Sequence, residues 1–311
     1  MSSKVTHSVM FHHFHGESHL PSQGSITADQ FSQMIEFLSK QFNLIGASEY
    51  LEKFRLGSLS KSDICLSFDD ALKSQYDVAV PILDRYNLDA FFFIYTSIFT
   101  NKPDLLELYR YFRVNFFEDM NDFYNQFEER ISKLESDCLL KHKLRFREIK
   151  YLADRNFYTK RDRWFRYLRD CYLGPKRYHS IMEEMMVAMK FDYRQHFDRL
   201  WMSKADLQCL IKKGHIIGLH TFSHPTKISE LEKEQQRFEY QKNYDDLTKF
   251  TGNNITVMSH PCGDYNQDTL AVLKELKIEM GFRANMDIES INSPFEIPRK
   301  DHADLLRELN L

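Results

Sequence analysis

The sequence lacks any long apolar run. Of its 311 residues 42% are hydrophobic, yet no window approaches the roughly 20 apolar residues of a membrane-spanning helix. Residues 1–7 also lack the continuous apolar stretch of a secretory signal. We therefore expect a chain that has no membrane span and stays in the cytoplasm.

Positive charge is not in excess either. The formal net charge is -3 and the pI is near 6.5. Nucleic acids and anionic membranes are bound through a basic surface, so this balance argues against either as the main partner. The net charge gives no further information about the class of substrate.

Cysteine pairs with metal-binding or redox spacing are absent. The chain has five cysteines and no Cys-x-x-Cys, which favours reduced and mostly buried thiols. Internal repeats and low-complexity segments are absent too. The cysteines are Cys65, Cys138, Cys171, Cys209 and Cys262.

Two polar motifs stand out against this background. His220 and His224 are four residues apart, and Asp69 and Asp70 end an apolar run far upstream. Each motif alone is weak, since two such histidines can share a helix face by chance and an Asp pair is often a solvated turn or a helix cap.

The local context strengthens both motifs. Residues 64–68 (ICLSF) and 214–219 (GHIIGL) each have the composition of a strand, so Asp70 and His220 would follow strand ends. Sites assemble at the carboxyl ends of strands in barrels and open α/β folds. Two imidazoles and one carboxylate leave an open coordination position, as in catalytic zinc sites.

The chain alternates between strand and helix patterns at both ends. Residues 5–14, 43–47, 64–68 and 90–95 are predicted strands, and Thr27 with Gln30 resembles a capping box before a helix. This alternation favours a parallel sheet that is closed or nearly closed into a barrel.

Residues from about 101 to about 200 break this alternation. They have helical periodicity with many aromatic and charged residues, and no strand pattern of comparable strength. Because the Asp-Asp and histidine motifs flank the segment, it is predicted to be an insertion between two strands. It is either a lid or substrate-selecting subdomain, or helical packing or a dimer surface.

Three motifs, in order along the chain, resemble those of a known family. Residues 202–207 and 214–224 are similar to the polysaccharide deacetylases of carbohydrate esterase family 4, which have the NodB-homology fold. Residues 67–71 (SFDDA) resemble the family's Thr-Phe-Asp-Asp-Gly motif, with Ala71 in place of glycine, and residues 259–266 resemble its third, proline-containing motif.

The resemblance implies a fold and a domain organisation. We expect a distorted (β/α) barrel of the NodB-homology type within the α/β class. Residues 1–311 would form a single catalytic domain that carries the helical insertion.

The resemblance also implies a metal site. Asp70, His220 and His224 would hold a divalent metal, for which zinc is our prediction, and Asp69 would act as general base. A zinc-type ion polarises an acetamide carbonyl and lowers the pKa of water toward about 7. The alternative for Asp69 is a structural cap.

The third motif would supply the oxyanion donor. In the family this donor is a backbone N–H, and the matching position is Cys262. A backbone role tolerates any side chain. The rival hypothesis is a nucleophilic Cys262 activated by His260, which would leave the metal triad without a purpose.

The sequence departs from the family pattern at two roles. The arginine that orients the base is replaced by His260, and Arg299 could reach the same carboxylate or could form only a surface salt bridge. His302 is our choice for the general acid, against a surface histidine. His12 and His13 could line the substrate pocket or be merely solvated.

The leading functional prediction is a metal-dependent hydrolase that removes an N-acetyl group from an amino sugar. The substrate would be an acetylated sugar, a nucleotide-linked sugar or a glycan precursor. The alternatives are a carbohydrate O-acetyl esterase and a catalytically silent sugar-binding member. The aromatic-rich insertion is also compatible with a homo-oligomer.

Overall fold

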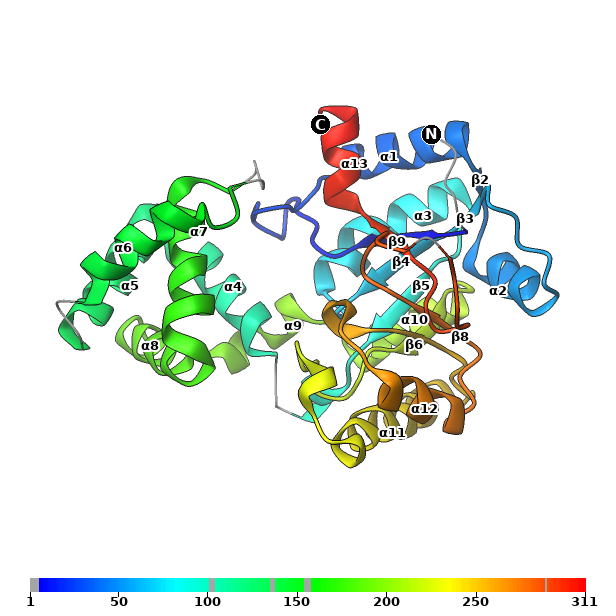
Figure 1. The fold of residues 1–311 in the computed structure, drawn as a ribbon. Helices are drawn as coiled ribbons and strands as arrows, with labels where there is room; N and C mark the ends of the chain where they lie inside the picture. The colour runs from blue at the N-terminus through cyan, green and yellow to red at the C-terminus, as the bar shows by residue number, and fades with distance from the viewer. Residues whose placement is uncertain (1–5, 101–103, 135–137, 154–157, 289) are drawn as a thin grey trace. The chain divides into compact units, whose positions relative to one another are not determined.

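The computed structural model describes residues 6–100, 104–134, 138–153, 158–288 and 290–311 (Figure 1). The chain forms two compact units, which we call the barrel unit and the helical unit. The barrel unit comprises Met1–Pro21, Ser25–Asp104 and Asp198–Leu311, and the helical unit comprises Ser22–Gly24 and Leu105–Phe197.

Seven parallel strands form the sheet of the barrel unit, in the order β8-β7-β6-β5-β4-β1-β9. Its two edges meet at Ile297, whose N–H donates to Gly281 O (3.0 Å) and whose carbonyl accepts from Arg283 N (2.8 Å). The sheet is therefore a nearly closed barrel, which confirms the predicted fold class. The strands are β1 Ser8–Phe11, β4 Leu66–Asp69, β5 Phe91–Ile94, β6 Ile216–Leu219, β7 Val257–Ser259, β8 Met280–Phe282 and β9 Arg299–Asp301.

Strand β5 shows how the two faces of the sheet are packed. Phe91 and Phe93 share one face and contact Phe282, with ring centroids 5.3 and 5.5 Å away. Phe92 points to the other face and stacks on Phe68 at 4.7 Å. Since residues two apart in a strand share a face, the first face is the barrel interior and the second lies under the helices.

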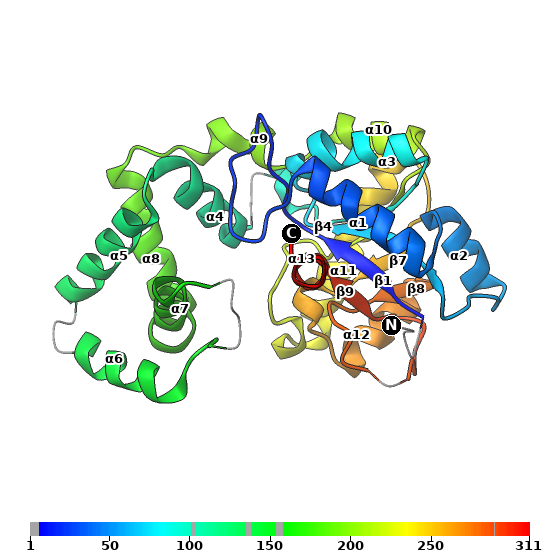
Figure 2. The ribbon, with the colours of Figure 1, turned by 90° about the horizontal axis from the view of Figure 1, so that it is seen from above.

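Helices cover the outside of the barrel, with α1 packed against α3 (Figure 2). The predicted capping box is present at α1, where Thr27 and Gln30 bond reciprocally. No helix in the described part of the chain has both the length and the apolarity needed to cross a bilayer. The α-helices here are α1 Ala28–Gln41, α2 Ala47–Arg55, α3 Val80–Tyr86, α10 Lys204–Lys212, α11 Lys233–Thr251, α12 Gln267–Glu275 and α13 His302–Leu309.

Two predicted strands differ from the structure. The expected strand at 43–47 is only β2 (Asn43–Leu44), which pairs with β3 (Asp63–Ile64) in a separate two-stranded sheet. The strand expected at 64–68 is divided, because Ile64 O accepts from Ile45 N while Cys65 O accepts from Val9 N. Adjacent residues thus pair with different strands. Residue 5, the expected start of the first strand, lies outside the described residues.

The helical unit has an aromatic core. Phe165 packs edge-on against Phe123 and Phe127, and Tyr178 lies against Phe127 and Phe165. Over the described part of 105–197 the chain has helices and no strand, and Asn101, the expected start of the insertion, lies outside that part. The α-helices are α4 Leu105–Phe116, α5 Met120–Leu134, α6 Cys138–Ile149, α7 Lys160–Tyr167 and α8 Gly174–Ala188, with α9 Phe197–Leu200 at the return to the barrel.

Candidate metal centre

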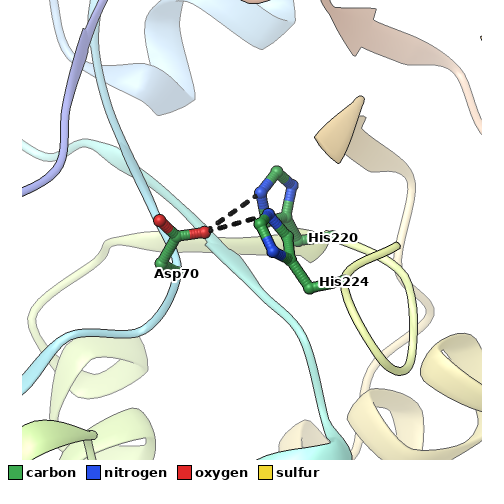
Figure 3. Close-up of side chains that lie close together, drawn as sticks. All are labelled: Asp70, His220 and His224. Carbon is green, nitrogen blue, oxygen red and sulfur yellow. Dashed lines mark ion pairs between the residues drawn. The ribbon is translucent and has the colours of Figure 1, made fainter. Parts of the chain in front are cut away.

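Three side chains meet at the carboxyl ends of β4 and β6. Asp70 follows β4 directly, His220 follows β6, and His224 lies in the loop beyond it. Figure 3 shows one Asp70 oxygen facing both rings, with Oδ1 at 3.4 Å from His220 Nε2 and 3.3 Å from His224 Nε2. The two histidines therefore converge through a loop and not along a helix face.

These three ligand atoms fit a divalent cation. Asp70 Oδ1 is buried and has no hydrogen-bond donor in the described part of the chain. Ligands bound at 2.0–2.1 Å in tetrahedral geometry are about 3.3 Å apart, which matches the observed separations. The ligand atoms of the three residues all lie within 4.8 Å of one another. Nitrogen and carboxylate donors in this ratio suit zinc or a similar transition metal.

Each histidine is oriented by a hydrogen bond at its other ring nitrogen. His220 Nδ1 lies 2.9 Å from Ser259 O, and His224 Nδ1 lies 2.6 Å from Asp104 Oδ2. With Nδ1 donating to these oxygens, each Nε2 keeps its lone pair toward the cluster. Such outer hydrogen bonds set the tautomer and orientation of metal-ligating histidines.

Helix α11 holds the histidine loop in place from behind. The His220 N–H donates to Asn243 Oδ1 (2.9 Å), and Ser223 donates through both N–H and Oγ to Glu239 (2.7 Å each). No sequence motif indicates that Glu239, Asn243 and Asp104 contact the histidine loop. The only signal for the first two is their i, i+4 spacing, which places two polar residues on one helix face.

The backbone at the site adopts unusual conformations. Asp70, Ala71, Thr221, His224 and Cys262 all have positive φ, between 53° and 77°. They are five of the eleven non-glycine residues with positive φ in the described part of the chain. Residues other than glycine rarely adopt this region, and such strain concentrates at functional sites.

Asp69 is held by a buried arginine. Arg299 Nη1 and Nη2 donate to its two carboxylate oxygens at 2.7 and 2.6 Å, and Ser259 Oγ lies 3.2 Å from Oδ2. Burial by itself would raise the pKa of the Asp69 carboxyl, but the positive charge of Arg299, with a smaller contribution from His220, leaves that pKa lowered. Asp69 is therefore a carboxylate at neutral pH.

Arg299 reaches Asp69 through the barrel interior. Its guanidinium lies 5.7 Å from the Phe93 ring centroid, and Nη1 also donates to Ser67 Oγ (3.2 Å). Ser67 and Asp69 are two residues apart on β4 and so share the interior face. Arg299 is fully buried, so the surface salt bridge considered above is not what forms.

The third motif places Cys262 beside the cluster in a tight turn. In the part of the chain that the structure describes, the Cys262 backbone N–H has no acceptor. Burial of the thiol raises the pKa of Cys262, and the negative charges of Asp70 and Asp104 raise it further, to about 12. The thiol is protonated at neutral pH, although the residue keeps some surface exposure.

His260 does not pair with Cys262. Its Nε2 donates to Phe295 O at 2.9 Å, and its ring stacks on Tyr265 with centroids 4.2 Å apart. Burial lowers the pKa of His260 to about 3, so the ring is neutral. A buried histidine with these partners is not a base for the Cys262 thiol.

His12, which the sequence suggests only as a pocket-lining residue, lies close to the Asp69 carboxylate. His12 Nε2 is 3.8 Å from Asp69 Oδ2, and its side chain is 25% exposed. Gln75 Nε2 donates both to His12 O (2.8 Å) and to Asp69 O (2.6 Å), which links their backbones. The His302 side chain is 6% exposed, lies against the Phe11 ring and has Nδ1 3.2 Å from Asp301 Oδ1.

Sequence comparison gives one family match. Residues 181–281, which include His220, His224 and the third motif, match the family model described as polysaccharide deacetylase. This match agrees with the resemblance drawn from the motifs and confirms it. None of the curated protein sequences matches the chain significantly.

Solved structures with the same fold cover nearly the whole chain. The Streptococcus pyogenes deacetylase PplD in complex with acetate has a TM-score of 0.54 at 17% identity, over 95% of this chain and 91% of that one. IcaB from Ammonifex degensii has a TM-score of 0.54 at 13% identity, over 96% of this chain and 91% of that one. The deacetylase domain of BpsB from Bordetella bronchiseptica has 0.52 at 15%, over 97% of each chain.

Proposed function

We propose that this chain, which resembles the polysaccharide deacetylases over residues 181–281, is a metal-dependent hydrolase that removes an N-acetyl group from an amino sugar. The observation that carries the proposal is the pairing of two adjacent carboxylates with different environments. Asp70 faces two imidazoles, whereas Asp69 is bound by Arg299. One carboxylate is thus set up to hold a metal and the other to accept a proton.

Asp70, His220 and His224 would hold the metal, and zinc is the ion that we propose. When bound, such an ion supplies Lewis acidity toward the acetyl carbonyl and toward water. Ser259 and Asp104 keep the imidazoles in the tautomer that this role requires.

Asp69 would accept the proton of the attacking water. The two hydrogen bonds from Arg299 hold its carboxylate in one orientation, and the positive charge keeps it ionised before reaction. Arg299 would therefore act as a positioning residue, in the place of the arginine that the third motif lacks.

The N–H of Cys262 would donate to the oxyanion that develops as the carbonyl carbon becomes tetrahedral. The positive φ of Cys262 (53°) is part of the tight turn at this position. The raised pKa of the Cys262 thiol favours this backbone role over nucleophilic attack, because a thiolate is the nucleophilic form.

Protonation of the departing amine needs an acid that the substrate can reach. The sequence points to His302, but the exposure of His12 and its 3.8 Å approach to Asp69 favour His12. We propose His12 as the general acid, with His302 as the second candidate. His302 packs on Phe11 beside His12, with the two histidine ring centroids 6.4 Å apart.

The substrate class is proposed on the same basis. An acetylated sugar, a nucleotide-linked sugar or a glycan would fit, and residues 1–311 would form one catalytic domain that carries the helical insertion. The same centre could cleave an O-acetyl ester, which demands less from a general acid. A silent sugar-binding member would have no need of both a base and a metal-ligand set.

The test is acetate release from a panel of N-acetyl and O-acetyl sugars by the zinc-reconstituted protein and by Asp69→Asn. We expect release from an N-acetyl sugar by the wild type and a loss of at least 100-fold in the variant. Bound zinc should be equal in both, by metal analysis. Tight zinc binding without release from any substrate would contradict the deacetylase proposal.

A further inference from the structure

The helical unit differs in charge from the rest of the chain. Residues 105–197 contain 19 Lys and Arg but 15 Asp and Glu, a net charge of +4 within a chain of net charge -3. The rest of the chain therefore has 23 Lys and Arg against 30 Asp and Glu, a net charge of -7. A local positive excess of this kind calls for either a structural or a ligand-binding explanation.

Three arginines of α4 and α7 lie near one another within the helical unit. Arg110 and Arg113 are three residues apart on α4 and so share one face, and Arg166 lies on α7. Arg110 Nη2 donates to Gln23 O (2.5 Å) and Arg166 Nη2 to Gln23 Oε1 (3.2 Å), so both reach the same residue. We call these three the arginine cluster.

Aromatic rings lie against two guanidiniums of the cluster. The Arg113 guanidinium lies 5.3 Å from the Phe123 ring centroid and 4.9 Å from that of Phe165. The Arg166 guanidinium lies 4.1 Å from the ring of Tyr158. Stacking of this kind fixes the plane of a guanidinium and leaves its edge free to bind a planar or tetrahedral anion.

The hydrogen-bond acceptors of the cluster are all neutral. Within the described residues Arg110 and Arg166 donate to a hydroxyl, a backbone carbonyl and an amide oxygen of Ser22 and Gln23. Arg113 Nε is buried and has no partner there. An orphaned guanidinium N–H is costly to bury, which points to an acceptor that is not part of the chain.

Nearby carboxylates are committed elsewhere or act on one arginine alone. Asp170 is paired with Arg169 at 2.5 Å, and Asp162 accepts from Thr159 and Tyr124. Glu107, one turn from Arg110, partly offsets its charge. Among the described residues, no carboxylate forms an ion pair with these three guanidiniums.

The positive charges of the three guanidiniums repel one another, as the lowered pKa values of Arg110 and Arg166 indicate. Burial lowers the pKa of the Arg110 guanidinium, and the neighbouring charges of Arg113 and Arg166 lower it further. Burial lowers the pKa of Arg166 as well, and Arg169 and Arg113 add to the lowering. A bound anion would relieve this repulsion.

We propose that Arg110, Arg113 and Arg166 form a binding site for a phosphate-type anion within the helical unit. Guanidinium forks bind phosphate oxygens in pairs, and three of them suit a doubly charged group better than a single carboxylate. The anion is either a phosphate or diphosphate group carried by a sugar, or a free phosphate.

The first experiment measures binding and does not depend on activity. Inorganic phosphate and a nucleoside diphosphate are titrated into the full-length zinc-loaded protein by calorimetry. We expect saturable one-site binding that weakens at least tenfold in Arg113→Gln and in Arg166→Gln. Arg161→Gln is the control, since it removes an equal charge from α7 but bonds Asn121 and Asn125 instead.

Two results would contradict the proposed anion-binding site. One is the absence of saturable binding by the wild-type protein. The other is equal weakening in Arg161→Gln, which would indicate a diffuse charge effect. Circular dichroism of each variant shows whether it is folded, and the wild-type titration decides the matter even if a variant does not fold.

A second arm identifies the source of the anion. A diphosphate-linked sugar is titrated in the same way as inorganic phosphate. If the anion is carried by a sugar, the linked sugar binds at least tenfold more tightly than phosphate and loses this binding in Arg166→Gln. If the anion is free phosphate, the linked sugar binds no more tightly than phosphate does.

Discussion

Arg299 binds both carboxylate oxygens of Asp69 across the interior of the barrel, at 2.7 and 2.6 Å. The two residues are 230 positions apart and come from strands on either side of β1. Ser259 joins the pair through its hydroxyl and supports His220 through its carbonyl. One residue of β7 thus connects the proposed base to a proposed metal ligand.

The first prediction concerns this pair. Arg299→Lys keeps the charge but lacks the planar fork that donates from two nitrogens in a fixed geometry, so the Asp69 carboxylate loses its fixed orientation. We expect turnover to fall at least tenfold while bound zinc stays at the wild-type level, measured by acetate release and metal analysis. The control is Arg55→Lys, because Arg55 makes a similar two-point contact with Glu279 at the exposed surface. Unchanged turnover in Arg299→Lys would contradict the positioning role.

The second prediction separates the two candidate acids. His12→Gln should lower kcat at least tenfold for an N-acetyl substrate and much less for an activated acetate ester, because an ester's good leaving group departs without a proton. His302→Gln should have the smaller effect on the amide reaction. His13→Gln is the control for a neighbouring histidine. If His302→Gln alone lost amide activity, the assignment would pass to His302.

The third prediction concerns metal affinity. Asp104→Asn weakens the hydrogen bond that orients His224 and should reduce zinc affinity about 10–100-fold. Competition with a fluorescent chelator measures the dissociation constant. Asp77→Asn is the matched control, since Asp77 also pairs with a histidine, His19, at 2.9 Å but away from the three ligands. Equal affinity in wild type and Asp104→Asn would show that the His224 contact does not support metal binding.

The fourth prediction concerns packing at β6. A Cβ at Gly218 would lie 2.5 Å from the Phe93 ring and 2.9 Å from Val257, so Gly218→Ala should destabilise the protein by about 1–3 kcal/mol. Urea unfolding measures the change. Gly16→Ala is the control, because its nearest neighbour would be at 3.6 Å and we expect a change within about 0.5 kcal/mol. A Gly218 variant as stable as the Gly16 variant would mean that the barrel adjusts without cost.

The fifth prediction is a pH dependence of stability. His215 is buried and its Nδ1 accepts the Ala90 N–H at 3.1 Å. Burial lowers its pKa to about 4 from the usual 6.5, and the charges of Asp89 and Asp84 offset only part of this. Between pH 4 and pH 6.5, His215 therefore binds a proton in the unfolded chain but not in the folded one. The stabilisation is complete above pH 6.5 and declines as pH falls toward 4, by on the order of 3 kcal/mol.

His215→Gln removes this titration. The difference in unfolding free energy between wild type and variant should be constant above pH 6.5 and change steadily below it, measured by urea titration at several pH values. The variant is the reference for every other group that titrates in this range. A difference independent of pH from 4 to 7 would show that His215 does not remain neutral in the fold.

Local sequence was sufficient for many of the elements and for the order of the motifs. The apolar runs before Asp69 and His220 predict strands because strand propensity is a local property, and Thr27 with Gln30 predicts a helix start for the same reason. The family resemblance then predicted the barrel, which the structure confirms. The division of 64–68 between two sheets was missed, because a run of apolar residues does not show which strand each will pair with.

The contacts that prepare the site were decided by tertiary structure. Asp104 and the α11 residues Glu239 and Asn243 carry no motif, and only folding brings them to His224, Ser223 and His220. The sequence offered Arg299 only as a candidate for Asp69, since spacing along a chain does not report distance across a barrel. Closing the sheet placed that charge in the interior, where burial makes an unpaired arginine too costly and pairing with Asp69 the favourable outcome.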